Sequence, residues 1–179
     1  MERVMRYVVL FCLMLFSGAL AGNGDSLEIY KWQKFNSFGF NASSVSGLGL
    51  SYRYHAVGPN LVMLSGGIVS SNDWVAASLG AEYQYEISER EDLRYYLAIG
   101  GGLYYTEDEV YDGFSPEPVT SMDTDFHLGV GVGFEYPFLG SSIFRNMTVG
   151  LTLYYPAIYF NNSGTNIGMG VGAYFFYNF

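Results

Sequence analysis

Residues 73–87 read DWVAASLGAEYQYEI, and this stretch decides the fold class. Apolar and polar residues alternate along it with a period of two. In a β-strand, successive side chains point to opposite faces, so this period indicates a strand with one apolar and one polar face. The apolar face comprises Val75, Ala77, Leu79, Ala81, Tyr83, Tyr85 and Ile87, and the other carries Trp74, Ser78, Gly80, Glu82, Gln84 and Glu86.

The same alternation predicts six more strands. It is clear at residues 93–106, 125–136 and 167–179, and less sharp at 45–55, 61–70 and 147–159. An up-and-down barrel with both termini at one end needs an even number of strands, so we expect an eighth within residues 27–43. The predicted fold is all-β, an antiparallel up-and-down transmembrane β-barrel of about eight strands.

The amino-acid composition favours a β-protein in a non-aqueous environment. Half of the 179 residues are apolar, only 14% are charged, and Tyr, Phe and Gly number 17, 14 and 23. Soluble domains carry about 25% charged residues, and aromatic residues favour strands. The net charge of −9, with only eight Lys and Arg residues, argues against a nucleic-acid partner.

The N-terminal segment has the pattern of an export signal. Arg3 and Arg6 precede an apolar run at residues 7–16, and a small-x-small pattern ends at Ala21. We therefore expect a signal peptide at 1–21 and a barrel domain at 22–179. The run is shorter than the roughly 20 residues of a spanning helix, and no later segment reaches that length. Cys12, the only cysteine, would leave with the signal.

Alternation alone leaves open whether the apolar face points inward, as in a soluble lipocalin-type barrel, or outward to lipid. The apolar faces of the clear strands carry no charge, and the opposite faces are rich in glycine, which a soluble exterior would not favour. Tyrosines gather near the strand ends, as in a membrane-interface girdle. These are Tyr52, Tyr54, Tyr83, Tyr85, Tyr95, Tyr105, Tyr136 and Tyr177. The pattern favours a membrane barrel.

With these features the chain resembles the small outer-membrane barrels of Gram-negative bacteria, the class of the outer membrane protein A-like domain. The alternating C-terminal residues Phe175, Tyr177 and Phe179 resemble the sorting signal that the barrel-assembly machinery reads. The resemblance implies outer-membrane lipid and lipopolysaccharide as surroundings and a periplasmic C-terminus. Turns at 56–60, 88–92 and 137–145 would then be periplasmic, and an acidic loop at 107–124 would face outward.

Strand directions place five charged residues in the periplasmic half of the lumen, namely Arg53, Glu82, Glu86, Arg94 and Glu135. If Ile87 opposes Leu93, then Glu86 opposes Arg94 as a cross-strand ion pair. The layer has two interpretations. The charges either fill a lumen just wide enough for side chains, or form a gate that opens when pairs exchange.

Above this layer, the inward face is predicted to be glycine: Gly100, Gly102, Gly129, Gly131, Gly133, Gly168, Gly170 and Gly172. Three interpretations remain. The space admits a ligand such as an acyl chain, it receives residues 29–35 as a plug, or glycine permits tight curvature while tyrosines fill the rest. The tyrosines in question are Tyr96, Tyr104, Tyr154 and Tyr174.

An enzyme of the lipid A-modifying type is a remote alternative, because His127 follows Ser121, Asp123 and Asp125. The deacylase pattern has a serine two residues after the histidine, where this chain has Gly129. We therefore expect no catalytic residues. We also expect no cofactor and no metal, since the acidic residues Glu107, Asp108, Glu109 and Asp112 are typical of a solvated loop. The expected role is structural or in surface interaction. The main alternative is a narrow channel or a binding site for small hydrophobic molecules.

Overall fold

The structure, a computed structural model, describes residues 36–56, 58–71, 74–90, 93–110, 119–137 and 146–179. The predicted signal peptide and residues 29–35 lie outside this part of the chain. Within it, no helix is long and apolar enough to cross a membrane.

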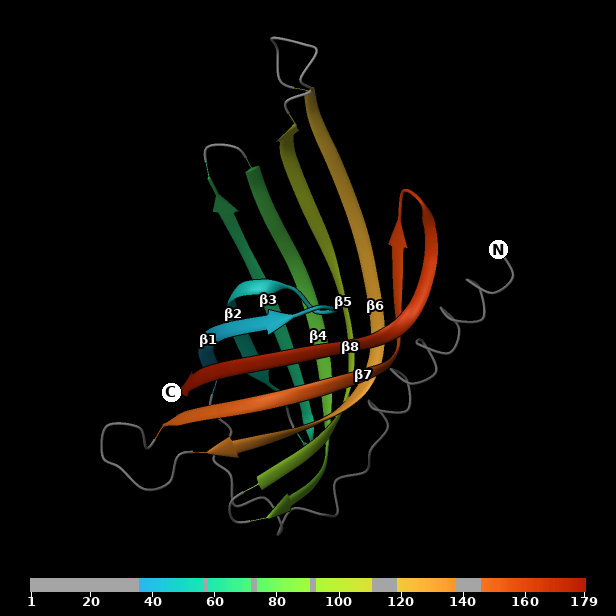
Figure 1. Cartoon of the computed structure of the whole chain (residues 1–179). Helices are drawn as coiled ribbons and strands as arrows, with labels where there is room; N and C mark the ends of the chain where they lie inside the picture. The colour runs from blue at the N-terminus through green and yellow to red at the C-terminus, as the bar shows by residue number, and fades with distance from the viewer. Residues whose placement is uncertain (1–35, 57, 72–73, 91–92, 111–118, 138–145) are drawn as a thin grey trace. The chain divides into compact units, whose positions relative to one another are not determined.

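Eight consecutive antiparallel strands form one closed barrel (Figure 1). Each strand pairs with its neighbours in sequence, and the first pairs with the last, so the predicted fold class and strand number are confirmed. The strands are β1 (Ser37–Ser43), β2 (Leu48–His55), β3 (Asn60–Ser70), β4 (Trp74–Arg90), β5 (Leu93–Val110), β6 (Val119–Pro137), β7 (Met147–Asn161) and β8 (Gly164–Asn178).

The barrel closes where β1 meets β8. Phe38 lies opposite Tyr177, and Phe40 lies opposite Phe175. The backbone N–H of Phe179 donates to the carbonyl of Asn36 at 2.9 Å, so both ends of the described chain lie at the same end of the barrel. We call this the terminal end and the opposite one the distal end.

The longest strands extend further than the sequence predicted. The β5–β6 pairing continues past the apolar segment, with Glu107 opposite Met122 and Asp108 opposite Ser121. The expected acidic loop at 107–124 is therefore wrong in its bounds, because residues 107–110 and 119–124 are strand. Backbone pairing needs no apolar side chains, so the ladder extends beyond the apolar face.

The shortest hairpin also differs from the prediction. Residues 45–55 were expected as one strand, but β2 begins only at Leu48 and Val45 lies in the turn before it. Gly47 and Gly49 have φ values of 93° and 130°, which L-residues with a side chain rarely adopt. These glycines allow the chain to reverse sharply after the seven residues of β1.

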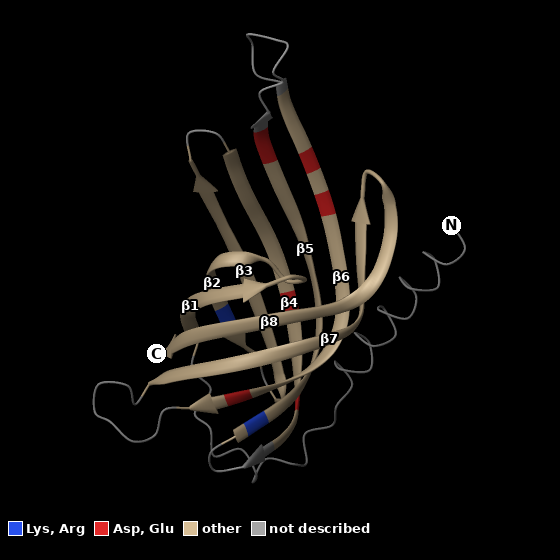
Figure 2. Cartoon of the chain, in the orientation of Figure 1, with Lys and Arg blue, Asp and Glu red and all other residues tan. Residues whose placement is uncertain are grey.

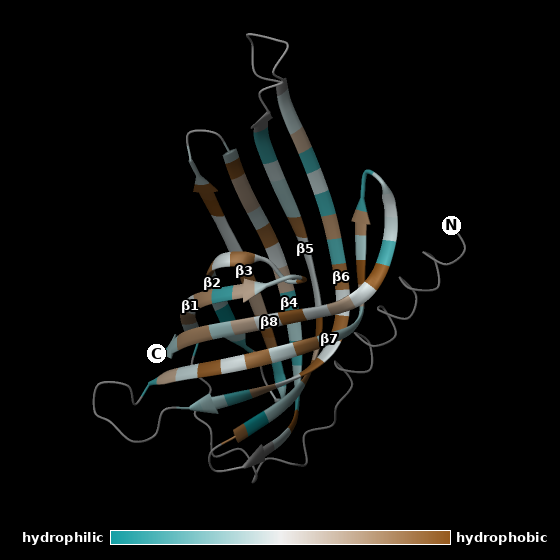
Figure 3. Cartoon of the chain, viewed as in Figure 1, coloured by the Kyte–Doolittle hydropathy of each residue, from teal (hydrophilic) through white to brown (hydrophobic). Residues whose placement is uncertain are grey.

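Exposure alternates along the strands as a barrel wall requires. On β8, Tyr174 and Phe176 are buried inside, whereas Phe175 and Tyr177 are exposed. The outward residues are mainly apolar (Figure 3), and charged residues are few along the strands (Figure 2). The apolar face therefore points away from the lumen.

Candidate functional site in the barrel lumen

A charged layer occupies the lumen toward the terminal end. Glu135 on β6 accepts hydrogen bonds from Arg53 on β2 and from Arg94 on β5. The Arg94 Nη2 to Glu135 Oε2 distance is 2.6 Å, and Arg53 binds both carboxylate oxygens. Tyr174 donates a further bond of 2.8 Å to Oε2. One buried carboxylate therefore joins two buried guanidinium groups.

The two arginines also pack on aromatic rings. The guanidinium carbon of Arg53 lies 4.6 Å from the ring centroid of Phe176, and that of Arg94 lies 5.3 Å from the ring of Tyr96. Each arginine thus has a charged partner on one side and an aromatic face on another. This packing leaves little freedom for the two side chains.

Glu82 extends the layer toward the centre of the barrel. Its carboxylate accepts from Gln84 Nε2 at 2.8 Å, from Ser46 Oγ at 2.7 Å and from the hydroxyl of Tyr154. Gln84 in turn accepts from Arg94 at 3.2 Å. The layer is therefore one connected network from Arg53 to Ser46.

The predicted pairing of Glu86 with Arg94 across the strands is wrong in register. Glu86 lies opposite Tyr96, and Arg94 lies opposite Glu89, because the pairing continues to Arg90 and Leu93 and a bulge interrupts it between Glu86 and Ser88. The strands also continue to Arg90 and Leu93, leaving a shorter connection than expected. Glu86 Oε2 still lies 3.9 Å from Arg94 Nη1.

Above the charged layer, the chain itself fills the lumen. The turn between β1 and β2, residues 43–47, points inward, and Val45 and Ser46 have no exposed surface. We call these residues the lumen turn. The hydroxyl of Tyr104 holds both its ends, donating to the Ser43 carbonyl at 2.6 Å and accepting from the Gly47 N–H at 2.9 Å.

Internal hydrogen bonds stabilise the lumen turn as well. Ser43 Oγ accepts from the N–H groups of Val45 at 3.1 Å and Ser46 at 3.0 Å, which is the usual bonding of a serine turn. Asn41 Nδ2 donates to the Gly47 carbonyl at 3.0 Å and to Ser65 Oγ at 3.1 Å. The turn is thus bonded within itself and, through Asn41, to β1.

Five of the predicted glycines make room for this turn, namely Gly100, Gly102, Gly129, Gly170 and Gly172. A Cβ at Gly102 would lie 2.8 Å from the Val45 carbonyl oxygen, and one at Gly170 would lie 2.7 Å from Val45 Cγ2. Both distances are shorter than real Cβ contacts. Glycine is therefore needed at these positions because another segment approaches closely.

The other three predicted glycines have different neighbours. A side chain at Gly133 would overlap the ring of Tyr96, and one at Gly131 would overlap the β7 backbone at Leu153. Gly168 would meet only the ring of Tyr159, at 3.6 Å. The sequence analysis missed Gly80, which faces the backbone of Ser46, and Gly150, which faces the ring of Tyr174.

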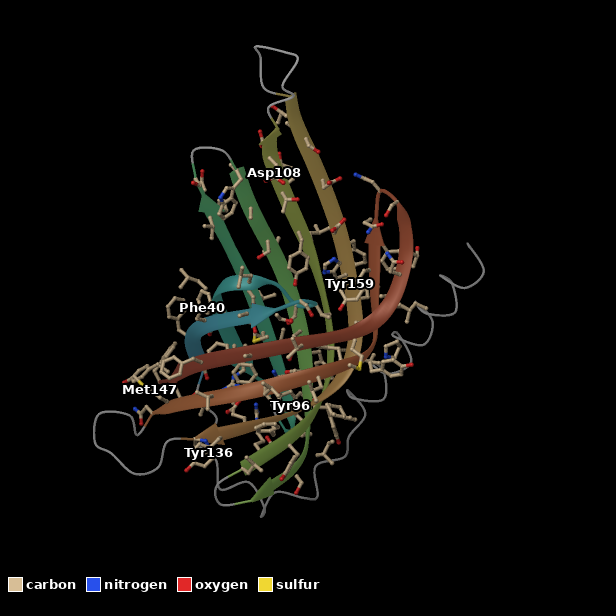
Figure 4. The ribbon with its side chains drawn as sticks, in the orientation of Figure 1. Phe40, Tyr96, Asp108, Tyr136, Met147 and Tyr159 are labelled. Atoms are coloured by element: carbon tan, nitrogen blue, oxygen red, sulfur yellow. The ribbon has the colours of Figure 1, made fainter. Side chains whose placement is uncertain are left out.

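The expected tyrosine packing is present together with the turn. Tyr96, Tyr154 and Tyr174 are almost fully buried, and Figure 4 shows Tyr96 among the strands toward the terminal end. The lumen turn itself was not foreseen. The sequence feature that marks the turn is the run SSVSG at 43–47, whose small residues lie between two short apolar segments.

Three aromatic rings lie beside the turn on the distal side. His127 stacks on Tyr104 with centroids 4.4 Å apart and meets the edge of Tyr159 at 4.7 Å. Its Nδ1 lies 2.8 Å from the Ser44 carbonyl, so this nitrogen carries the proton and donates. Asp123, considered as a partner in catalysis, instead accepts from Asn162 at 2.9 Å. The ring of His127 therefore serves to hold the lumen turn.

The three residues of the predicted sorting signal line one face of the final strand. Phe175, Tyr177 and Phe179 are all exposed, pointing away from the lumen. Phe175 and Tyr177 lie on the seam where β8 closes against β1. In the part of the chain that the structure describes, no group of three or more His, Cys, Asp or Glu side chains is placed to hold a metal.

The described barrel superimposes on barrels of known structure. The N-terminal β-barrel domain of Pseudomonas aeruginosa OprF superimposes with a TM-score of 0.50 at 16% identity, over 82% of this chain and 98% of that domain. The chain has the fold of a small outer-membrane β-barrel. Neisserial surface protein A (NspA) superimposes with a TM-score of 0.45 at 16% identity, over 80% of this chain and 94% of that chain. No family model and no curated protein matches the sequence.

Proposed function

We propose that this protein is an integral outer-membrane barrel that spans the membrane without conducting, and that it acts through structure and surface contact rather than catalysis. The observation that carries the proposal is the filled lumen. The charged layer, the buried tyrosines and the lumen turn follow one another along the barrel axis with buried side chains throughout.

The outer surface of the barrel supports a position in the membrane. Leu50, Leu64, Leu79, Val132 and Leu153 are each more than half exposed, although they lie on eight- to nineteen-residue strands whose other face is buried along most of its length. In water such a surface would be a strong aggregation hazard, whereas in a bilayer it matches the hydrocarbon.

Outward tyrosines support the same placement. They cluster near the terminal end on five strands, where a headgroup girdle would use a ring with one polar atom. The exposed members are Tyr52, Tyr54, Tyr85, Tyr95, Tyr136 and Tyr177. With the C-terminal Phe175, Tyr177 and Phe179 as the sorting signal, the terminal end would face the periplasm.

The lumen contents support a closed barrel. The network around Glu135 uses both arginines of the layer, and charges that are paired and bonded in this way resist separation. The lumen turn adds a second obstruction bonded to β4, β5, β6 and β7. We therefore expect the charged layer to be packing, not a gate.

We expect the distal end of the barrel to make the surface contacts. There, β5 and β6 carry exposed acidic residues beyond the filled lumen (Figure 2). Since the ring of His127 is used in holding the turn, the arrangement gives no support to lipid A chemistry.

Two measurements test the proposal. Fractionation of cells, with heat-modifiable migration of the protein on a gel, should give a folded barrel in the outer membrane. Planar-bilayer recordings should show no channel events from the intact protein or from Glu86→Ala. A soluble periplasmic product would refute the membrane placement, and steady single-channel events from the intact protein would refute the closed lumen.

A further inference from the structure

The first hairpin is shorter than both of its neighbours. The last β1–β8 pair is Ser43 with Gly172, and the last β2–β3 pair is Leu50 with Gly66. Beyond these pairs, β8 pairs only with β7, and β3 pairs only with β4 (Figure 1). We call the missing two-strand part of the wall the lateral gap. Its borders are residues 68–70 of β3 and 164–169 of β8, since the backbone of Leu48 and Gly49 lies against Gly67.

Exposure shows that the described chain does not cover the gap. Val69 lies on the lumen side of β3 by alternation, yet it is 52% exposed, like its outward neighbour Ile68. On β8, Asn166 and Ile167 point to opposite faces, and both are exposed. Both faces of these border residues are therefore exposed, and the missing strand pairing locates the opening beside them.

The β8 border offers backbone hydrogen-bonding groups. The N–H of Val171 donates to Ser44 Oγ at 3.0 Å rather than to a strand carbonyl, and the Val171 carbonyl accepts from the Ser44 N–H at 2.9 Å. The Met169 carbonyl accepts from the Tyr159 hydroxyl at 2.8 Å. Alternate residues of a strand face the same neighbour, so the N–H and C=O of Ile167 also face the gap.

Behind the gap lies the aromatic cluster of Tyr104, His127 and Tyr159. His127 stacks on Tyr104, meets the edge of Tyr159 and bonds to the lumen turn at Ser44, and the Tyr159 hydroxyl bonds to the β8 backbone at Met169. The lipid-facing side of the borders adds apolar side chains, with Ile68, Ile167 and Met169 each at least 70% exposed, and Val69 lies on the lumen side. The surroundings therefore combine apolar contacts with a few fixed polar groups, as ligand sites do.

The charge distribution limits what this site would bind. The Lys and Arg residues of the described strands are Arg53, Arg90 and Arg94, and all lie toward the terminal end. The distal parts of β5 and β6 instead carry Glu107, Asp108, Asp123 and Asp125. A phosphate or carboxylate would meet repulsion and no cation, so an anionic ligand is disfavoured.

We propose that the lateral gap is a binding site for an uncharged hydrophobic molecule that carries one neutral hydrogen-bonding group. Its apolar part lies against Ile68, Val69 and Met169, and its polar group bonds to the Ile167 backbone or the Tyr159 hydroxyl. The inference rests on the membrane placement proposed above, because the site opens through the wall toward lipid. The lumen turn closes the site below, so the molecule binds without passing through.

A matched pair of fluorescent probes tests the ligand class. N-phenyl-1-naphthylamine is neutral, whereas 8-anilinonaphthalene-1-sulfonate has the same ring system with an anionic group. With the barrel in phosphatidylcholine nanodiscs, and empty nanodiscs subtracted, the neutral probe should bind saturably at one site. The sulfonate should bind at least tenfold more weakly. Absence of saturable neutral binding, or equal binding of the sulfonate, would overturn the proposal.

A matched pair of variants tests the location. A Cβ at Gly168 would lie 3.6 Å from the Tyr159 ring, so Gly168→Leu places a side chain in the site without a backbone clash. It should weaken neutral-probe binding at least tenfold. Val132→Leu, on the lipid-facing side of β6, should leave binding within twofold of the wild type. Equal binding by Gly168→Leu and wild type would overturn the location.

The same samples keep this inference separate from the proposed function. Heat-modifiable migration reports whether a folded membrane barrel is present, whatever the probes do. A wild-type barrel that migrates as folded but binds no neutral probe overturns the site alone. A wild-type protein that never inserts overturns the membrane placement, and the site with it.

Discussion

The side chain of Val45 occupies the volume that a side chain at Gly170 would need, since a Cβ there would lie 2.7 Å from Val45 Cγ2. The two residues are far apart in sequence, on the first turn and the last strand. Their contact explains why a glycine stands on the inner face of β8 at this height. It also shows that the lumen is filled by the chain's own backbone, so the first prediction concerns this pair.

Gly170→Val should destabilise the barrel by about 1–3 kcal/mol, the usual cost of overpacking a filled core. The added side chain meets Val45 and Ser44, both held in place by hydrogen bonds. Denaturant unfolding in detergent, followed by tryptophan fluorescence, measures the change. Gly168→Ala is the control on the same face of β8, where a Cβ makes an ordinary contact. Equal stability of the two variants would contradict the described position of the turn.

Glu135→Gln should destabilise the barrel by about 3–5 kcal/mol, because it leaves the buried Arg53 and Arg94 without their shared carboxylate. The amide keeps the size of the side chain, so the loss reports charge and not volume. The midpoint of denaturant unfolding gives the value. Asp108→Asn removes an acidic charge near the distal end of β5 and should change stability by less than about 0.5 kcal/mol. If Glu135→Gln lowered the free energy of unfolding as little as Asp108→Asn does, the ion pairs would contribute little to stability.

Tyr154→Phe should lower stability by about 1–3 kcal/mol, since the hydroxyl bonds to the buried Glu82 carboxylate and to Ser46. Tyr155→Phe is the matched control. Tyr155 is adjacent in sequence but 72% exposed on the outside of the barrel. Thermal or denaturant unfolding of the two variants in the same detergent makes the comparison, and a larger effect in Tyr155→Phe would refute the inward orientation of Tyr154.

Val45→Cys should resist maleimide labelling in the folded barrel and react after heat unfolding, because the side chain at this position has no exposed surface. Asn166→Cys, at an exposed position on β8, should react in both states. Cys12 is the only other cysteine in the sequence and lies in the predicted signal, so the exported variants each carry one thiol. The extent of labelling is read by mass. Fast labelling of Val45→Cys in the folded state would place the turn outside the lumen.

The sequence by itself determined the features that depend on local alternation. The period of two predicted seven strands, and the even number that closure requires predicted the eighth. The uncharged apolar faces and the glycine-rich opposite faces predicted that the apolar faces point outward. The small Gly and Ser positions and the buried charges such as Arg53 and Glu135 were visible on the polar face. These features follow from which side of a strand each residue occupies, and that needs no knowledge of distant neighbours.

Only the tertiary structure decided how the interior is filled. The β5–β6 register places Arg94 opposite Glu135, which it meets more closely than it meets Glu86 on the previous strand. β1 has only seven residues and ends before its neighbour β8 does. Residues 43–47 therefore turn into the lumen, and the gap remains beside β8. Alternation along one strand carries no information about its length relative to others. The contents of the lumen and the opening in its wall therefore depend on contacts between segments far apart in the chain.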